Sequence, residues 1–293
     1  MPAGEQAHLL ARPDGVRIAY RRIGARRRAG KAPALLLHGL ASNLTRWSEF
    51  VERTTLAEQR DVIRVDLRGH GDSPARGRLS LEGWCDDLLA LLDAIEAPRA
   101  LLVGHSLGAQ VALACATRAP QRVAALVLID PVFRSALHGR WKWIARAAPL
   151  FVAAAAIVRA LNALGLRRRE IAPLDLRALD ELARASLGSP QAEAEFIRRY
   201  SSTRADLRTF RSAHYLQELV EMFRPLASPE SIAMPTLVLL STGATFAALP
   251  EMRAIAARFP RGQVQTVDCH HWPLTERPDE VRDLIDTWCA AQR

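Results

Sequence analysis

Short apolar runs alternate with segments of helical spacing along most of this chain. Each run is rich in Leu, Val and Ile, and a segment such as residues 84–95 repeats apolar side chains at the helical interval. Strands buried on both faces are typical of parallel sheets, whose crossovers are helices. The pattern therefore predicts an α/β fold with a mostly parallel central sheet flanked by helices. Its strands are expected at residues 35–37, 62–65, 100–103 and 125–129.

The two ends of the chain extend this pattern. Residues 8–23 alternate loosely around Asp14-Gly15, a pair typical of a hairpin turn, so the chain is expected to open with two antiparallel strands. The alternation of strand and helix returns near the C-terminus. There we expect strands at 236–240 and 263–267 and helices near 251–259 and 279–288.

The strand signal disappears in the middle of the chain, where the pattern is helical alone. A chain of 293 residues can hold a large core and an insertion. The sequence therefore predicts a core made of residues 1–130 and 231–293, with a helical insertion at 131–230.

The most apolar stretch of this insertion, residues 147–158, is shorter than the roughly 20 apolar residues of a membrane-spanning helix. A helix that is apolar all round needs cover on two sides. One side can be the core, and the other a ligand, a membrane surface or a partner subunit; simple burial among neighbouring helices is the plain alternative. One stripe of this helix comprises Leu150, Ala154, Ile157, Leu161 and Leu164.

Residues 104–108, Gly-His-Ser-Leu-Gly, follow a predicted strand and precede a predicted helix. In that setting G-x-S-x-G is a nucleophile elbow: Ser106 lies on a strained turn that pushes its hydroxyl out of the sheet. The positive end of the helix that starts at Leu107 lies where an oxyanion would form. The motif predicts acyl-transfer chemistry at Ser106.

Three further blocks occur in a fixed order around this motif. With it, they resemble the α/β-hydrolase superfamily over nearly the whole chain. The blocks are ALLLHGL at 34–40, DLRGHGDS at 66–73 and HHWPLTERP at 270–278. The resemblance implies the α/β-hydrolase fold, and it identifies the insertion at 131–230 with the helical cap of many members.

The same resemblance implies roles for single residues. His271, rather than His270, lies at the position of the family's catalytic histidine, and His270 stands where Gly is usual. The backbone N–H groups of Leu40 and Leu107 would form the oxyanion hole. The other motif histidines are expected to hold backbone or loops: His38, which we also place at the substrate pocket, His70 and His105.

The acid of the triad is missing from its usual place. No Asp or Glu occurs between Glu230 and Glu251, where the family carries this carboxylate after the strand at 236–240. Asp130, at the end of an earlier strand, keeps the order Ser, Asp, His and is our preferred acid. Asp268, Glu251 and no acid at all remain open alternatives.

Composition narrows the classes of partner. A hydrophobic content of 49% and a mean hydropathy of −0.02 are typical of a soluble globular protein. The net charge of +9 invites nucleic-acid binding, but no nucleic-acid module accompanies it, so none is expected. The arginine clusters at 26–28 and 167–169 are interpreted as solvated loops, with contact to anionic lipid as the less favoured alternative.

We expect no metal and no cofactor, because His and Cys are not arranged at ligand spacing and no phosphate-binding loop is present. Four scattered cysteines fit reduced thiols, and the first 15 residues lack the apolar stretch of a signal peptide. These features favour a cytoplasmic location. The sequence does not predict an oligomeric state.

The sequence thus predicts a serine hydrolase that cleaves a carboxylic ester or related acyl bond of a small, largely apolar substrate. Hydrolysis of a carbon–carbon bond in a diketone and a catalytically weak ligand-binding role are the alternatives, the second because of the missing acid. The predicted pocket residues are His38 with Leu150, Phe151, Ile157 and Leu161 of the insertion.

Overall fold

The computed structural model describes most of the 293-residue chain. The described residues are 2, 4–27, 30–166, 171–186, 195–198, 200, 202–243 and 246–292.

Eight strands form one sheet in the order β1-β2-β4-β3-β5-β6-β7-β8. The pairs β1–β2 and β2–β4 are antiparallel, and the pairs from β4 to β8 are parallel. The mostly parallel α/β sheet and the opening hairpin predicted from the sequence are confirmed. The strands are β1 (Glu5–Ala11), β2 (Arg17–Ile23), β3 (Ala34–Leu37), β4 (Val62–Val65), β5 (Ala100–His105), β6 (Val123–Ile129), β7 (Thr236–Ser241) and β8 (Gly262–Val267).

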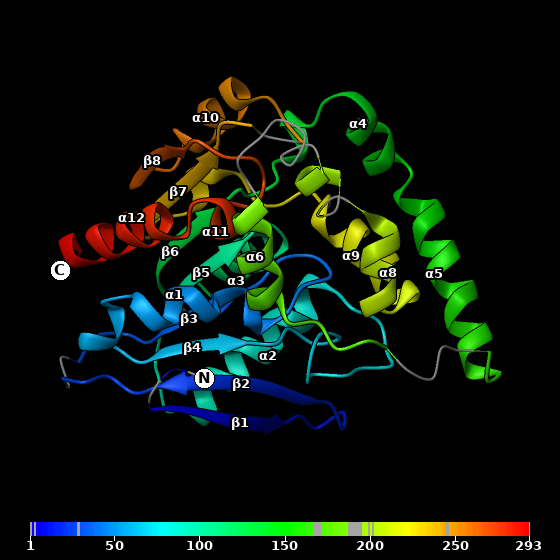
Figure 1. Ribbon diagram of the computed structural model, residues 1–293, viewed down its shortest axis with the longest axis horizontal. Coiled ribbons are helices and arrows are strands. Elements are labelled where there is room, and N and C mark those ends of the chain that lie inside the picture. The colour runs from blue at the N-terminus through cyan, green and yellow to red at the C-terminus, as the bar shows by residue number, and fades with distance from the viewer. Residues whose placement is uncertain are drawn as a thin grey trace.

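Helices cover both faces of this sheet (Figure 1). Leu35 and Leu37 of β3 belong to a buried cluster with one helical layer, and Leu36 belongs to a cluster with the other. Successive strand side chains point to opposite faces, so an all-apolar strand such as β3 needs both layers. One layer comprises α2 (Leu81–Ala94), α3 (Leu107–Arg118) and α10 (Leu249–Ala256); the other comprises α1 (Ser48–Arg53) and α12 (Pro278–Ala291).

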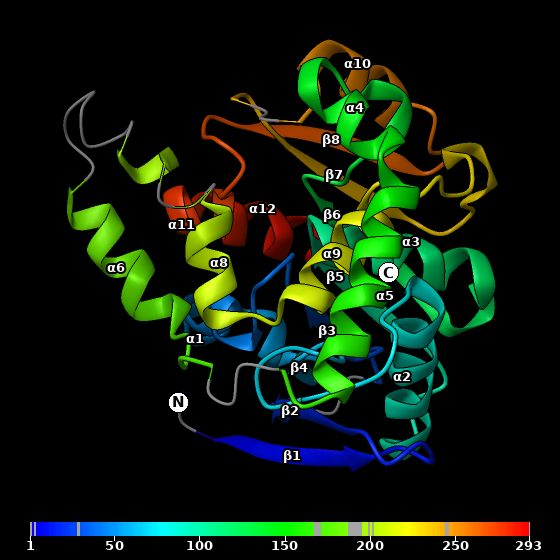
Figure 2. The same ribbon diagram turned by 90° about the vertical axis from the view of Figure 1, so that its right-hand side faces the viewer.

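The described residues between β6 and β7 form helices, as the pattern predicted. Of these helices, α5 packs against α9, and α6 packs against the short helix α11 (Pro273–Glu276) and the 3-10 turn Leu44–Trp47. Figure 2 shows α5 passing in front of α9 on the side turned to the viewer. The helices are α4 (Gly139–Arg146), α5 (Ala148–Ala163), α6 (Leu176–Ser186), α8 (Thr203–Thr209) and α9 (Ser212–Met222).

Candidate active site

Ser106 stands alone between the end of β5 and the start of α3. Its backbone has φ +52° and ψ −114°, a strained combination for a residue with a side chain. A Cβ at Gly104 would collide with the backbone of Gly108, and one at Gly108 would collide with the Leu37 carbonyl. Both glycines are therefore needed for the close approach of strand and helix that the elbow predicts.

A chain of polar contacts leads away from the Ser106 hydroxyl. Nε2 of His271 lies 3.1 Å from Ser106 Oγ, and Nδ1 of the same ring lies 3.3 Å from Oδ2 of Asp130. All three side chains are buried. They follow β5, β6 and β8 at the carboxyl ends of parallel strands, which meet at one edge of the sheet. The structure thus brings Ser106, His271 and Asp130 together.

Asp130 is held in place by β7, the strand after which the triad acid was expected but is absent. Ser241, the last residue of β7, donates its backbone N–H to Asp130 Oδ1 at 2.7 Å and its hydroxyl to Oδ2. Burial raises the pKa of Asp130, but the His271 ring and the two Ser241 bonds outweigh burial and hold the pKa below its ordinary value. Asp130 is therefore an ionised carboxylate that can hold the His271 ring in one orientation.

The other two carboxylates considered for this role have different surroundings. Asp268 is exposed and accepts a hydrogen bond from the Thr242 hydroxyl at 2.7 Å. Glu251 is exposed in the first turn of α10. Of the three candidates, Asp130 is the one that contacts the His271 ring.

The two predicted oxyanion donors are main-chain groups beside Ser106. The N–H groups of Leu40 and Leu107 have no hydrogen-bond partner within the part of the chain that the structure describes. Leu107 is the first residue of α3, so its N–H adds to the positive end of the helix dipole. The next residue after Leu40, Ala41, has φ +47° and donates its N–H to Glu218 Oε2 at 3.0 Å.

Glu218, on α9, also meets the fully buried ring of His70. Its Oε1 lies 2.7 Å from His70 Nε2, while His70 Nδ1 lies 3.2 Å from the Leu67 carbonyl. Burial lowers the pKa of His70 to about 4 and raises the pKa of Glu218 well above its usual range. Burial therefore favours the neutral form of each group.

The remaining motif histidines hold the backbone around the site. His38 is fully buried, accepts from the Leu67 N–H at 3.1 Å and donates to the Gly39 carbonyl at 2.9 Å. His105 donates from Nε2 to the His271 carbonyl at 3.0 Å, and burial lowers the pKa of His105 to about 3. His38 therefore offers no free ring nitrogen to a pocket, because both of its nitrogens bind backbone.

Three of the predicted pocket residues lie elsewhere. Leu150, Ile157 and Leu161 are exposed on the outer side of α5, and Phe151 is half-buried. The expectation that these leucine and isoleucine side chains line the site is therefore corrected. The physical reason is that α9 packs between α5 and the core and covers only the inner side of α5.

Aromatic rings that the sequence did not single out stand at the site instead. The Phe246 ring meets the His271 ring edge-on, with 4.5 Å between the ring centroids. Trp141 of α4 packs on Phe246, also with 4.5 Å between the centroids. Trp272 lies beside His271 and contacts Phe196 and Tyr200 of the insertion. Phe246 follows β7, the strand after which the family's acid was expected, and Trp272 belongs to the HHWPLTERP block. The sequence motifs could therefore have pointed to both residues.

His105, Asp130 and His271 also offer one ligand atom each within 4.8 Å of one another. Their donor atoms already have partners: His105 Nε2 binds a carbonyl, His271 Nε2 faces Ser106 Oγ, and Asp130 accepts from Ser241. The hydrogen-bonded chain accounts for this cluster, and the expectation of no metal and no cofactor stays a prediction.

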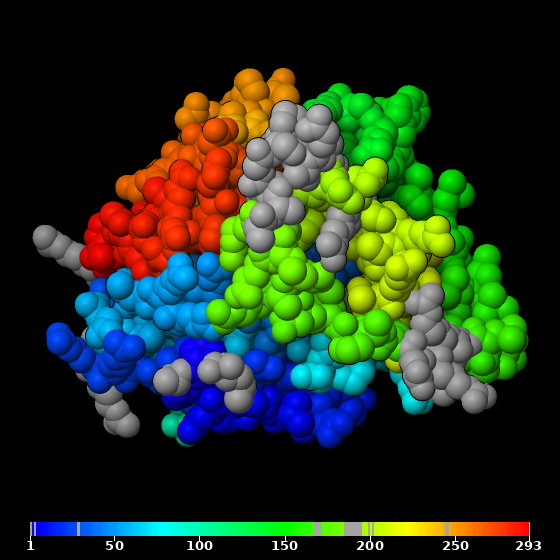
Figure 3. Space-filling view, viewed as in Figure 1, coloured from blue at the N-terminus to red at the C-terminus, as the bar shows by residue number. Residues whose placement is uncertain are grey.

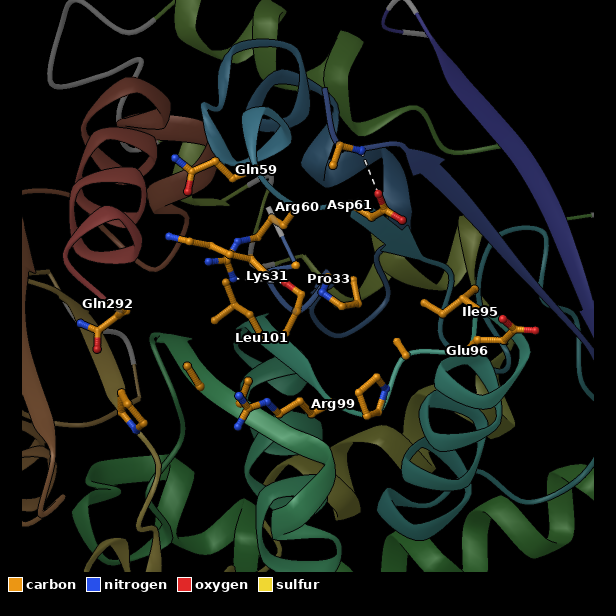
Figure 4. A pocket seen from close by; sticks show the side chains of 18 of the residues that line it. Lys31, Pro33, Gln59, Arg60, Asp61, Ile95, Glu96, Arg99, Leu101 and Gln292 are labelled. Carbon is orange, nitrogen blue, oxygen red and sulfur yellow. Dashed lines mark hydrogen bonds between the residues drawn. The ribbon is translucent and has the colours of Figure 1, made fainter. Parts of the chain in front are cut away.

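A separate cavity of about 1140 Å³ opens at the other end of the sheet. Lys31, Arg60 and Arg99 surround it in Figure 4, together with Leu101 near the start of β5. Ser106 follows the opposite end of the same strand, so this cavity is remote from the serine.

Sheet topology and elbow together define an α/β hydrolase, and the comparison with family models agrees. The model described as the alpha/beta hydrolase family matches residues 34–284. This protein therefore belongs to the α/β hydrolase family, and the predicted fold and enzyme class are confirmed.

Individual relatives resemble the chain over different lengths. The sn-1-specific diacylglycerol lipase ABHD11 of Mus musculus is 27% identical over 271 residues, covering 88% of this chain and 81% of that protein. The dihydrolipoyllysine-residue acetyltransferase component of the acetoin cleaving system of Pseudomonas putida is 44% identical over 101 residues, 34% of this chain but only 27% of that protein.

Among solved structures, a hydrolase from Pseudomonas aeruginosa PA01 is similar over the whole fold. It matches with a TM-score of 0.69 and 25% identity, covering 99% of this chain and 100% of that chain.

Proposed function

We propose that this protein is a serine hydrolase of carboxylic esters or related acyl bonds, acting on a small and largely apolar substrate. Ser106 Oγ attacks the carbonyl carbon as His271 Nε2 takes its proton, and the same proton then leaves with the alcohol. Water, activated by His271, hydrolyses the acyl-enzyme and restores Ser106. The Leu40 and Leu107 amides stabilise the oxyanion at both steps.

The observation that carries this proposal is the continuous contact chain from Asp130 through His271 to Ser106, at 3.3 and 3.1 Å. The alternative of a catalytically weak ligand-binding protein rested on the missing triad acid. Asp130, braced by Ser241, provides a carboxylate for that place. The two free amides beside a strained serine further support acyl transfer.

The helical insertion, residues 131–230, acts in this proposal as a cap. It contributes Trp141 and Tyr200 to the aromatic surroundings of His271, through Phe246 and Trp272 respectively. Aromatic rings favour an apolar substrate group. The similarity of this chain to a diacylglycerol lipase supports an acyl substrate.

The proposal is tested with a fluorophosphonate probe and an activated aryl ester. The wild-type protein should be labelled at Ser106 and should hydrolyse the ester. Ser106→Ala and His271→Ala should each abolish turnover while the far-ultraviolet circular dichroism stays unchanged, because triad members act as a unit.

His270→Ala is the matched control, since His270 bonds to Glu276 rather than to Ser106. Its activity should stay near the wild-type level. An unlabelled wild-type serine would overturn the proposal. Faster cleavage of a diketone than of every ester tested would instead favour the carbon–carbon hydrolase.

A further inference from the structure

The outer side of α4 and α5 is an exposed apolar surface. Trp143, Leu150, Ile157 and Leu164 are 68, 71, 62 and 79% exposed. Single exposed apolar residues are ordinary, but a contiguous patch marks a surface that contacts something else. We call the exposed side of α4–α5, residues 139–166, the outer face. It lies at the right-hand edge of the molecule in Figure 3.

The outer face follows from the helix register. Positions 150, 157, 161 and 164 share one side of α5, whereas Ala155 on the opposite side is fully buried. The only polar side chains of α5 are Arg159 and Asn162, which are half-buried. A solvent-facing helix normally carries charged residues on this side. Here that side is apolar from one end of α5 to the other.

Positive charge surrounds this face. Residues 139–166 contain four Lys and Arg and no Asp or Glu, so the segment that forms the outer face carries a charge of +4. Arg140, Lys142 and Arg146 are exposed on α4. The Arg146 guanidinium lies over the ring of exposed Trp143, 5.1 Å from its centroid. The four are Arg140, Lys142, Arg146 and Arg159.

The described part of the chain contains no single helix long and apolar enough to cross a membrane. The helices α4 and α5 are long and apolar enough only when taken together, and the chain bends by 57° between them. A helix with an apolar side, basic neighbours and a Trp at its edge fits the boundary between lipid headgroups and acyl chains.

We propose that the outer face seats on an anionic lipid surface. The apolar side chains of α5 enter the acyl boundary, Trp143 lies at headgroup level, and the basic residues of α4 contact the anionic headgroups. A second copy of the chain is a poorer occupant, because pairing two outer faces would bring two segments of +4 together.

Vesicle flotation with the full chain tests this proposal. Wild-type protein should float with vesicles of phosphatidylcholine containing about a third phosphatidylglycerol and should bind pure phosphatidylcholine far less. Its binding to the anionic vesicles should weaken when salt is added. Neutralising three basic residues, in Arg140→Gln/Lys142→Gln/Arg146→Gln, should weaken binding about a hundredfold. Trp143→Glu/Ile157→Glu/Leu164→Glu should abolish it.

The matched controls replace equally exposed residues on other elements. Leu9→Glu on β1 and Leu182→Glu on α6 should bind as the wild type does, and so should Arg17→Gln/Arg99→Gln/Arg253→Gln. Circular dichroism and melting temperature confirm that each variant is folded. Ser106→Ala should also bind, so the result is independent of the proposed hydrolysis.

Two results would overturn the proposal. One is a wild-type protein that does not bind anionic vesicles, or whose binding survives the three glutamate substitutions. The other is a wild-type dimer, seen by size-exclusion chromatography, that the same glutamates convert to monomers, since the outer face would then be an interface between copies.

Discussion

Asp130 occupies a backbone position that side chains rarely adopt. Its φ is +46°, and the two bonds from Ser241 compensate for that strain by fixing the carboxylate against His271. Ser241, the last residue of β7, thus supports an acid that directly follows β6. This arrangement places a carboxylate beside the His271 ring although β7 itself ends without one.

Asp130→Asn should lower kcat at least about a hundredfold, because the amide cannot stabilise the imidazolium formed when His271 takes the serine proton. Single-turnover and steady-state ester hydrolysis provide the measurement. Asp268→Asn and Glu251→Gln serve as controls and should stay close to the wild type. An unimpaired Asp130→Asn enzyme would leave a Ser-His dyad as the working site.

Glu218 should act as a positioning residue for the oxyanion loop, because it binds the Ala41 N–H next to the Leu40 donor. Glu218→Gln keeps the shape of the side chain and an oxygen that accepts from the Ala41 N–H, so it should retain most of kcat. Glu218→Ala should lower kcat more than it changes KM, since an oxyanion is held only in the transition state. Equal effects of the two substitutions on kcat would contradict this role.

At the scale of elements, α6 is joined to the core by charged contacts. Asp180 and Arg46 form a buried ion pair at 2.6 Å, to which Thr275 and Tyr200 add hydrogen bonds. More exposed pairs link Arg184 to Glu49 and Arg177 to Glu52. This cluster anchors α6 above α1 and α11, whereas α5 is held through apolar packing on α9.

Asp180→Ala should lower the free energy of unfolding by about 3–5 kcal/mol, because it leaves the buried Arg46 guanidinium without its counter-charge. Urea denaturation measures this loss. Glu181→Ala, which removes the exposed partner of Arg177 on the same helix, should change stability by less than about 1 kcal/mol. Similar losses in the two variants would show that the buried pair does not hold α6.

Much of this element-level arrangement was predictable. Apolar runs identified the strands, and the spacing of two glycines around Ser106 predicted the elbow, because both signals are local. The exposure of Leu150 was not predictable, because periodicity defines a helical stripe but not which neighbour covers it. The approach of Ser241 to Asp130 joins residues 111 positions apart, and such a contact leaves no local pattern.

At the scale of the whole molecule, ionisable groups buried in the folded state couple stability to pH. The Cys85 thiol and burial raise the pKa of Cys115 well above its usual range, and burial raises the pKa of Cys269 to about 12 and that of Cys289 to about 11. The chain has only two lysines, Lys31 and Lys142, so few other groups titrate in this range.

Stability should therefore fall as the pH rises through 9. Unfolded thiols lose their protons near pH 9 while the folded thiols keep theirs, so the folded state binds more protons, and each thiol contributes a loss of up to about 1.4 kcal/mol per pH unit until its folded pKa is reached. Urea midpoints between pH 8 and 10.5, measured under reducing conditions, should show this slope.

The variant Cys115→Ala/Cys269→Ala/Cys289→Ala should flatten the slope, because it removes the three groups that bind protons differently in the two states. Val127→Ala is the matched control: it truncates a fully buried side chain that cannot ionise, and it should lower stability by the same amount at every pH. A slope that persists in the triple variant would assign the alkaline loss to other groups, of which Tyr215 is the next candidate, because burial raises its pKa to about 12.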